Sequence, residues 1–338
     1  MSDFVHLHLH SEYSLLDGAC RIADIPKAVK ARGQKAVAIT DHGNMFGVIE
    51  FYKSAISEGI KPIIGCEVYL APGSRFEKSR INNISYYHLV LLCMNEVGYK
   101  NLSYLVSLGY TEGFYMKPRV DMELLRQHSE GLIALSACLS GYVPKSILMG
   151  DKNGALEHIT EMQKIFGKEN FYLEMQDHGI EEEARVNLEI IKLSSLTGAP
   201  LVCTNDVHYI DKDDAYSQLI LMSVQTNCTV SNNSKIAFPT NEFYLKDSNE
   251  MYKLFEEYPE ACENTVKIAQ RCNFDFTFGN TKLPKYRFCA PLTSKEYLRK
   301  LAYEGLEKRE AAGQIIYSEK HPKSLYIERM EYRCFLRN

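Results

Sequence analysis

Seven short apolar runs divide the first 210 residues and alternate with segments that have a helical pattern. The runs lie at residues 5–9, 36–39, 63–69, 87–92, 132–138, 171–175 and 201–206. The helical segments lie at about residues 22–32, 48–58, 96–108, 154–165 and 181–196. This alternation predicts an α/β fold in which helices cover a closed or nearly closed parallel barrel. An open doubly wound sheet is the alternative, but no glycine-rich nucleotide loop follows the first strand, which disfavours it.

The composition excludes several classes of protein. Of the 338 residues, 45% are hydrophobic and 24% are charged, as in a chain with a sizeable core, and the formal net charge of -4 gives no global attraction to nucleic acid. No apolar run reaches the length of a membrane span, and no secretory signal precedes the first strand. The ten cysteines are scattered and form no Cys-x-x-Cys pair, which is typical of reduced thiols. We therefore expect a cytoplasmic protein that makes no contact with membranes.

The first strand carries a His-x-His pattern. Residues i and i+2 share one face of a strand, so His8 and His10 project together and can bind one metal ion. Asp17 ends the loop that follows, where its carboxylate can fold back over the end of the strand. Imidazole and carboxylate ligands together suit Zn²⁺, Mn²⁺ or Fe²⁺. An edge strand with solvated histidines is the alternative interpretation of this pattern alone.

Potential metal ligands recur at the other strands, mostly at their carboxyl ends. They are His42, Glu67, His88, Cys138, Asp206 and His208, while the sixth strand instead offers Glu174, Gln176, Asp177 and His178. In barrel enzymes the chemistry lies at the carboxyl ends of the strands, so this placement favours a functional site over a chance scatter of polar residues.

Several longer motifs resemble those of the polymerase and histidinol phosphatase (PHP) family of metal-dependent phosphoesterases. They are HLHSEYSLLDG at 8–18, AITDHGNMFG at 38–47, GFYMKPR at 113–119, ALSACLSG at 134–141, FYLEMQDHG at 171–179 and TNDVHY at 204–209. Within the family, the chain is most similar to the N-terminal domain of bacterial replicative DNA polymerase III alpha subunits. The segment EYLRKLAYEGLEKR at 296–309 resembles the helix that opens their polymerase region.

The resemblance implies a fold and a ligand set. The fold would be a distorted TIM-like (β/α)7 barrel, the PHP fold, with a C-terminal helical extension. The site would hold three divalent ions, Zn²⁺, Mn²⁺ or Fe²⁺. One would bind His8, His10, Glu67 and Asp206; a second would share Glu67 and add His88 and Cys138; a third would bind Asp17, His42 and His208.

The resemblance also implies an activity. Clustered divalent ions suit phosphodiester hydrolysis, and in this family the expected reaction is removal of nucleotides from single-stranded DNA 3′ ends, a 3′→5′ exonuclease. Two alternatives remain open: a non-catalytic scaffold in which metals brace the polymerase core, and a histidinol-phosphatase-like enzyme acting on small molecules. Cys138 alone would be interpreted as a buried apolar residue, but among these ligands it suits a soft metal ligand. Asp41 would either orient a ligand or shape a turn.

Two basic loops are candidates for DNA contact. Their basic side chains are Arg75, Lys78, Arg80, Lys117 and Arg119, and the last two lie near Phe114 and Tyr115. Basic and aromatic side chains together suit phosphates and unstacked bases. Solvated loops with structural aromatic residues are the alternative.

The pattern changes along the chain and predicts two domains. Residues 1–283 would form the phosphoesterase-like domain, with a barrel core at about 1–210 and a covering segment at 211–283. Residues 284–338 would form the truncated start of a polymerase region. The polymerase palm of the family lies beyond residue 338, so we expect these residues to act with the remainder of the alpha subunit and its holoenzyme, and not to synthesise DNA alone.

Overall fold

The computed structural model describes residues 3–230, 238–280, 292–315 and 317–326. The chain forms two compact units, Met1–Phe276 and Thr277–Asn338. The second unit contains the amphipathic helix α11 (Ser294–Ala311), which begins with a capping box between Thr293 and Glu296. That helix was predicted within two residues at each end. The candidate site lies entirely in the first unit.

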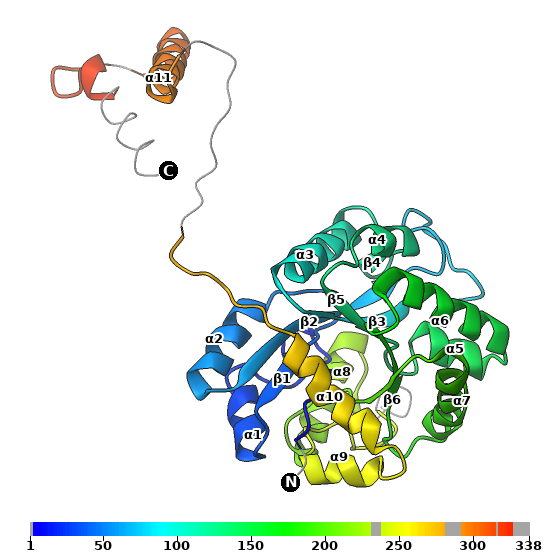
Figure 1. The fold of residues 1–338 in the computed structure, drawn as a ribbon. Helices are drawn as coiled ribbons and strands as arrows, with labels where there is room; N and C mark the ends of the chain where they lie inside the picture. The colour runs from blue at the N-terminus through cyan, green and yellow to red at the C-terminus, as the bar shows by residue number, and fades with distance from the viewer. Residues whose placement is uncertain (1–2, 231–237, 281–291, 316, 327–338) are drawn as a thin grey trace. The chain divides into compact units, whose positions relative to one another are not determined.

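A curled sheet of mixed direction forms the centre of the first unit (Figure 1). Its strands are β1 (Ala36–Ile39), β2 (Lys61–Leu70), β3 (Tyr87–Cys93), β4 (Arg119–Val120), β5 (Leu132–Leu135), β6 (Phe171–Met175) and β7 (Leu201–Cys203). The main path runs β1-β2-β3-β5-β6-β7, and the short β4 pairs with β2.

The N-terminal segment lies between the two ends of this sheet. The amide of Ala38 donates a hydrogen bond to the carbonyl of His6, and the amide of His10 donates to the carbonyl of Val207, both at 2.8 Å. The segment pairs in parallel with β1 on one side and with the residues after β7 on the other. These bonds close the curled sheet into a barrel, although the predicted strand at 5–9 forms isolated bridges and not a regular strand.

The expectation of an all-parallel barrel is wrong at β3. This strand runs antiparallel to both β2 and β5. The connection from β2 to β3 contains no helix within its described residues, 71–86, and antiparallel neighbours need no crossover helix. Because Tyr69 pairs with His88, the first residues of β3 lie beside the last residues of β2. The reversal therefore brings His88 to the same end of the barrel as Glu67.

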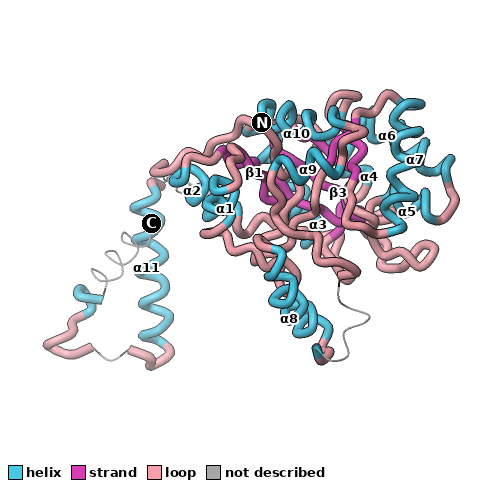
Figure 2. The backbone as a smooth tube through the Cα atoms, turned by 90° about the horizontal axis from the view of Figure 1, so that it is seen from below, coloured by secondary structure: helices cyan, strands magenta, loops and turns pink. Residues whose placement is uncertain are grey.

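Helices enclose the strands on the outside, as Figure 2 shows. They are α1 (Ile25–Ala31), α2 (Val48–Glu58), α3 (Glu96–Thr111), α4 (Met122–Gln127), α5 (Tyr142–Leu148), α6 (Lys152–Phe166), α7 (Glu181–Thr197), α9 (Ser248–Leu254) and α10 (Pro259–Arg271), whereas α8 (Ala215–Thr226) projects away from the strands. The predicted helices are present within a few residues of their expected ends, whereas α4 and α5 are too short to give a clear periodic pattern. No helix in the described ranges is long and apolar enough to cross a membrane.

Helix α10 fixes the N-terminal segment from outside. The hydroxyl of Thr265 accepts a hydrogen bond from the amide of Val5 at 3.1 Å and donates one to the carbonyl of Cys262 at 2.6 Å. Thr265 is fully buried, so water cannot replace it as the acceptor. The covering segment thereby holds in place the strand-like residues that precede His8.

We predict that Thr265→Val lowers the free energy of unfolding by about 1–3 kcal/mol, because the buried amide of Val5 loses its acceptor. Thr160→Val is a matched control, since Thr160 also bonds its own helix, at Leu156, but in an exposed position. Urea unfolding of both variants measures the difference. Equal stability losses would contradict the anchoring role of Thr265.

The ring of His158 is half-buried in the contact between α5 and α6. It stacks on Tyr142 with ring centroids 4.0 Å apart. Burial lowers the pKa of His158 to about 4. The folded protein therefore holds this imidazole neutral where the unfolded chain would protonate it.

Acid should destabilise the first unit through this residue. Between pH 6.5 and 4 the unfolded chain binds a proton at His158 that the folded chain does not, so stability falls as the pH falls through this window. At pH 5 we expect a loss of about 1–2 kcal/mol relative to pH 7 in the wild type beyond that in His158→Phe. Phenylalanine keeps a ring against Tyr142 but cannot titrate, and urea unfolding of both proteins at both pH values measures the difference. Parallel pH profiles would show that His158 does not titrate as described.

Candidate metal centre

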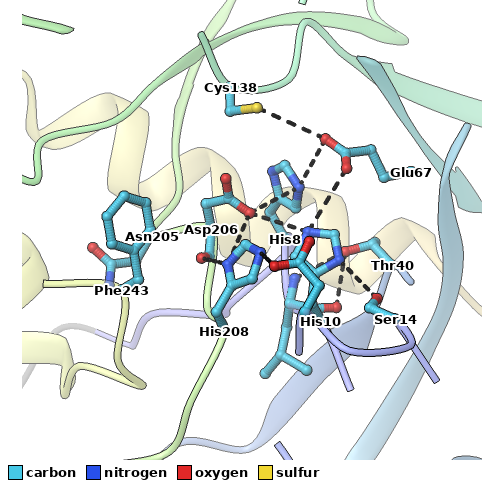
Figure 3. Close-up of polar contacts among 12 residues, drawn as sticks. His8, His10, Ser14, Thr40, Glu67, Cys138, Asn205, Asp206, His208 and Phe243 are labelled. Atoms are coloured by element: carbon cyan, nitrogen blue, oxygen red, sulfur yellow. Dashed lines mark hydrogen bonds and ion pairs between the residues drawn. The ribbon is translucent and has the colours of Figure 1, made fainter. Parts of the chain in front are cut away.

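The predicted ligands meet at one end of the barrel, where Figure 3 shows several of them as sticks. They come from the N-terminal segment (His8, His10), its following loop (Asp17), the residues after β1 (His42), β2 (Glu67), β3 (His88), and the residues after β5 (Cys138) and β7 (Asp206, His208). Each has at least one other member of the set within 4.0 Å. The structure therefore brings all nine predicted side chains into one cluster.

Glu67 lies at the centre of the cluster and is fully buried. Its Oε1 is 3.3 Å from Nε2 of His8 and 3.0 Å from Nδ1 of His88. Its Oε2 is 2.6 Å from Nδ1 of His42 and 3.8 Å from Nε2 of His10. Burial alone would raise the pKa of Glu67, but the surrounding imidazoles, His88 and His42 first, hold it well below its usual range. The carboxylate is thus ionised and has each oxygen directed to a different group of histidines.

The deepest group of ligand atoms belongs to His8, His10 and Asp206. Oδ1 of Asp206 lies 3.2 Å from Nε2 of His8 and 3.1 Å from Nε2 of His10. Asp206 has a φ of 41°, in the left-handed region that is strained for a residue with a side chain. With Glu67, these residues form the first predicted ligand set.

A second group contains Cys138. Its Sγ lies 3.7 Å from Nδ1 of His88 and 4.0 Å from Oε1 of Glu67. Burial, with the negative charges of Asp206 and Glu67, raises the pKa of the Cys138 thiol well above its usual value. A nearby cation is what would favour the thiolate form here.

The third group lies around Asp17. Its Oδ2 is 2.9 Å from Nε2 of His42, and its Oδ1 is 3.9 Å from Nε2 of His208. His42 also stacks on His10 with ring centroids 4.0 Å apart. Nδ1 of His42 faces Glu67 and its Nε2 faces Asp17, so the His42 ring connects the central carboxylate with the carboxylate of the third group.

Unpaired polar atoms test whether a cation fits the cluster. Among the described residues, the buried side-chain atoms without a hydrogen-bond partner include Nε2 of His8, Nε2 of His10, Asp17 Oδ1, His42 Nδ1, Glu67 Oε2 and Asp206 Oδ1. Buried polar atoms are nearly always paired, so several unpaired ones facing one another require an explanation. They are lone-pair donors of the kinds that bind divalent transition metals, and the donor set fits such ions.

Hydrogen bonds behind the ligands orient them. Nδ1 of His8 donates to Oε1 of Glu174 at 2.7 Å, which leaves Nε2 facing the cluster. Gln176 and Thr204 also donate to that Glu174 oxygen, at 3.0 and 2.5 Å. Glu174 was noted in the sequence only as one of several polar residues on the sixth strand, because no spacing rule connects it with His8. Carboxylate–histidine pairs of this kind support ligands in metal sites.

His10 is held in a similar way, through a serine. Its Nδ1 donates to Oγ of Ser14 at 3.1 Å, and Ser14 donates to Oδ1 of Asp41 at 2.8 Å. Asp41 also accepts from the amide and the hydroxyl of Ser11. Of the two roles considered for Asp41, the structure supports the ligand-orienting one.

Some side chains of the cluster are partly exposed to solvent, and others are completely buried. The side chains of Asp17, His42 and His88 are 18%, 15% and 13% exposed, whereas those of His8 and His10 are completely buried. A substrate would therefore approach past His42 and His88. Tyr69 lies beside both, with its ring centroid 6.1 Å from His42 and 5.3 Å from His88.

Three of the five predicted basic residues are bonded within the protein, and two are left to face solvent. Arg119 is 1% exposed, and its guanidinium donates to the carbonyls of Gly113, Ser85, Arg75 and Glu77. Arg75 pairs with Glu112, Asp121 and Glu123, and Lys78 donates to the carbonyls of Arg75 and Glu112. These three hold the loops together. Arg80 is exposed and Lys117 is partly exposed, and Nζ of Lys117 lies 5.5 Å from the ring centroid of Tyr69.

Comparison with known proteins identifies relatives. The chain matches the PHP domain family over residues 6–178. It is 49% identical over 310 residues to DNA polymerase III subunit alpha of Treponema pallidum, covering 91% of this chain and 26% of that protein. The subunit alpha of Thermus aquaticus is 41% identical over 316 residues, covering 90% of this chain and 26% of the relative. A solved structure of a candidate metal-dependent phosphoesterase from Bifidobacterium adolescentis is 10% identical, has a TM-score of 0.42, and covers 62% of this chain and 88% of its own.

The chain spans about a quarter of the length of these polymerase subunits. The family match covers about half of the chain and extends from the His-x-His segment to the end of the sixth predicted strand. The chain therefore belongs to the PHP domain family, and its sequence relatives are alpha subunits of DNA polymerase III.

Proposed function

We propose that this chain is a metal-dependent phosphodiesterase that removes nucleotides from the 3′ end of single-stranded DNA. The observation that carries the proposal is the group of inward-facing lone pairs around the buried carboxylate of Glu67. Family membership supports hydrolytic chemistry at this cluster. The polymerase relatives supply the DNA context.

Three divalent ions, Zn²⁺, Mn²⁺ or Fe²⁺, would occupy the three groups of ligand atoms. The first would bind His8, His10, Glu67 and Asp206; the second Glu67, His88 and Cys138; the third Asp17, His42 and His208. Divalent ions close together supply a water of lowered pKa and stabilise charge on the phosphate.

The chain's own residues then have separate tasks. Glu67 directs one oxygen toward His88 and the other toward His42, so its carboxylate would be shared between cations bound on the two sides of the cluster. Glu174 holds His8 with Nε2 inward. A protein nucleophile would not be needed, because a water held by the metals would attack the phosphate, and Cys138 would serve as a ligand. Lys117 and Arg80 would bind DNA phosphates, whereas Arg75, Lys78 and Arg119 would support the loops that carry them.

The activity would be exercised beside a polymerase. We propose that the remainder of an alpha subunit and its holoenzyme are the partners, in the cytoplasm, because the relatives are such subunits. A metal-braced scaffold without hydrolytic activity is the second candidate. It shares every ligand, so only an activity measurement separates the two.

Metal removal should destabilise the protein. Ligands from separate strands bind a metal ion together only when the barrel is folded. Each occupied site should therefore raise the free energy of unfolding, by about 2.7 kcal/mol when free metal is at 100 times its Kd. We expect about three ions per chain by elemental analysis and a lower Tm after chelation.

Glu174→Gln should weaken metal affinity about 10- to 100-fold, and Glu157→Gln, at an exposed position on α6, should not. An unchanged Tm after verified metal removal would exclude a metal centre at this cluster.

Glu67→Gln should reduce the rate of 3′ nucleotide release by orders of magnitude, because one substitution disturbs two ions at once. Glu157→Gln, purified identically, should match the wild type. The measurement is a time course on single-stranded DNA labelled so that each 3′ nucleotide released is counted. Equal rates for wild type and Glu67→Gln would identify a contaminant, and inert metal-loaded wild type would favour the scaffold.

A further inference from the structure

Three exposed aromatic side chains form a row beside the candidate metal centre. Phe46, Tyr110 and Phe114 are 62%, 40% and 52% exposed. The ring centroids of Phe46 and Tyr110 are 6.3 Å apart, and those of Tyr110 and Phe114 are also 6.3 Å apart. The planes are tilted by 37° and 34°. We call these three residues the aromatic row.

The aromatic row is connected to the accessible side of the metal centre. Phe46 follows the ligand His42 by four residues, so their Cα atoms lie within about 14 Å. The turn between them packs tightly: a Cβ at Gly43 would lie 2.7 Å from the ring of Tyr69 and 3.0 Å from Pro118. At the other end of the row, the residues after Phe114 lead directly to that same Pro118.

Two basic side chains, Lys117 and Arg80, belong to the same loops as the aromatic row or to neighbouring ones. Lys117 lies over the ring of Tyr69, which borders His42 and His88. Arg80 is exposed, and its guanidinium contacts the thioether of Met116 at 3.9 Å. Within the described part of the chain neither side chain is paired with a carboxylate. Burying aromatic rings in a protein interface would not require these two cations, whereas a nucleic-acid backbone would.

We propose that the aromatic row is a stacking surface for the unpaired bases of single-stranded DNA whose 3′ end lies at the metal centre. This inference rests on the proposed function and specifies the form of its substrate. Exposed ring faces stack on bases of any sequence, while lysine and arginine follow the phosphates. Inside a duplex both faces of each base are covered by neighbouring base pairs, and only the terminal pair leaves one face free. The row therefore selects frayed or single-stranded ends over paired ones.

The absence of tryptophan from the chain gives a direct test. Phe114→Trp introduces a single tryptophan, which can be excited selectively over the tyrosines, and Leu196→Trp, at a position 74% exposed on α7, is its matched control. With metal-loaded protein and an oligothymidylate whose linkages are phosphorothioates, which resist hydrolysis, adding the oligonucleotide should quench Phe114→Trp fluorescence and leave Leu196→Trp unchanged. A blunt duplex of equal length should quench Phe114→Trp much less. Equal quenching by single strand and duplex, or none by either, would overturn the inference.

Alanine variants separate stacking from charge. Phe46→Ala and Phe114→Ala should each weaken oligothymidylate binding about 5- to 100-fold, without changing the slope of affinity against salt. Lys117→Ala should instead reduce that slope by about one ion. Leu196→Ala should behave as wild type. Wild-type affinity in both phenylalanine variants would overturn the inference.

The two proposals fail differently. If oligothymidylate binds at the aromatic row but metal-loaded protein releases no nucleotide, the binding surface stands and the exonuclease proposal falls. If nucleotides are released and the phenylalanine variants bind and hydrolyse as wild type does, the exonuclease stands and the aromatic row does not contact DNA.

Discussion

The cluster depends on one buried carboxylate. Glu67 is fully buried, and an isolated carboxylate at such a position would favour the protonated form. Four imidazoles within 4 Å reverse that preference. They come from three segments of the barrel, the N-terminal segment, the residues after β1 and strand β3, so the charge of Glu67 is compensated only when all three are assembled. The carboxylate thus ties the electrostatics of the site to the closure of the fold.

The supporting hydrogen bonds show how a barrel can hold so many polar groups inside. Each deep histidine uses one ring nitrogen for a protein partner and presents the other to the cluster. Glu174 and the Ser14–Asp41 pair are such partners, and they in turn receive hydrogen bonds from Thr204 and Ser11. These polar side chains pair with one another behind the two histidines, so the ring nitrogens left without a partner, Nε2 of His8 and Nε2 of His10, are the ones that face the cluster.

Much of the site could be predicted because its signals are local in sequence. Alternation placed His8 and His10 on one face, and ligand types at strand ends identified His42 and Asp206. Contacts between distant segments gave no such signal: Glu174 is 166 residues from His8, and nothing in its spacing marks the pair. Arg119 illustrates the opposite error, since a basic residue in a polar loop was expected to face DNA but binds carbonyl oxygens inside the protein. The antiparallel direction of β3 was not predicted, because an apolar run gives no sign of whether a strand lies parallel or antiparallel to its neighbours.

That reversed strand also affects how the family can vary. A ligand carried after a parallel strand depends on the length of the helix and loop that precede it. His88 instead depends on its pairing with Tyr69, two residues beyond Glu67, across a hairpin. Arg75 and Arg119 fix most of the intervening residues, but residues 81–83 are exposed. A flexible loop can lengthen at a cost of only about 0.6 kcal/mol for each doubling, because loop closure varies slowly with length. Insertions at residues 81–83 would leave the spacing of Glu67 and His88 intact, which makes this exposed stretch a tolerant position for acquiring new surface contacts during evolution.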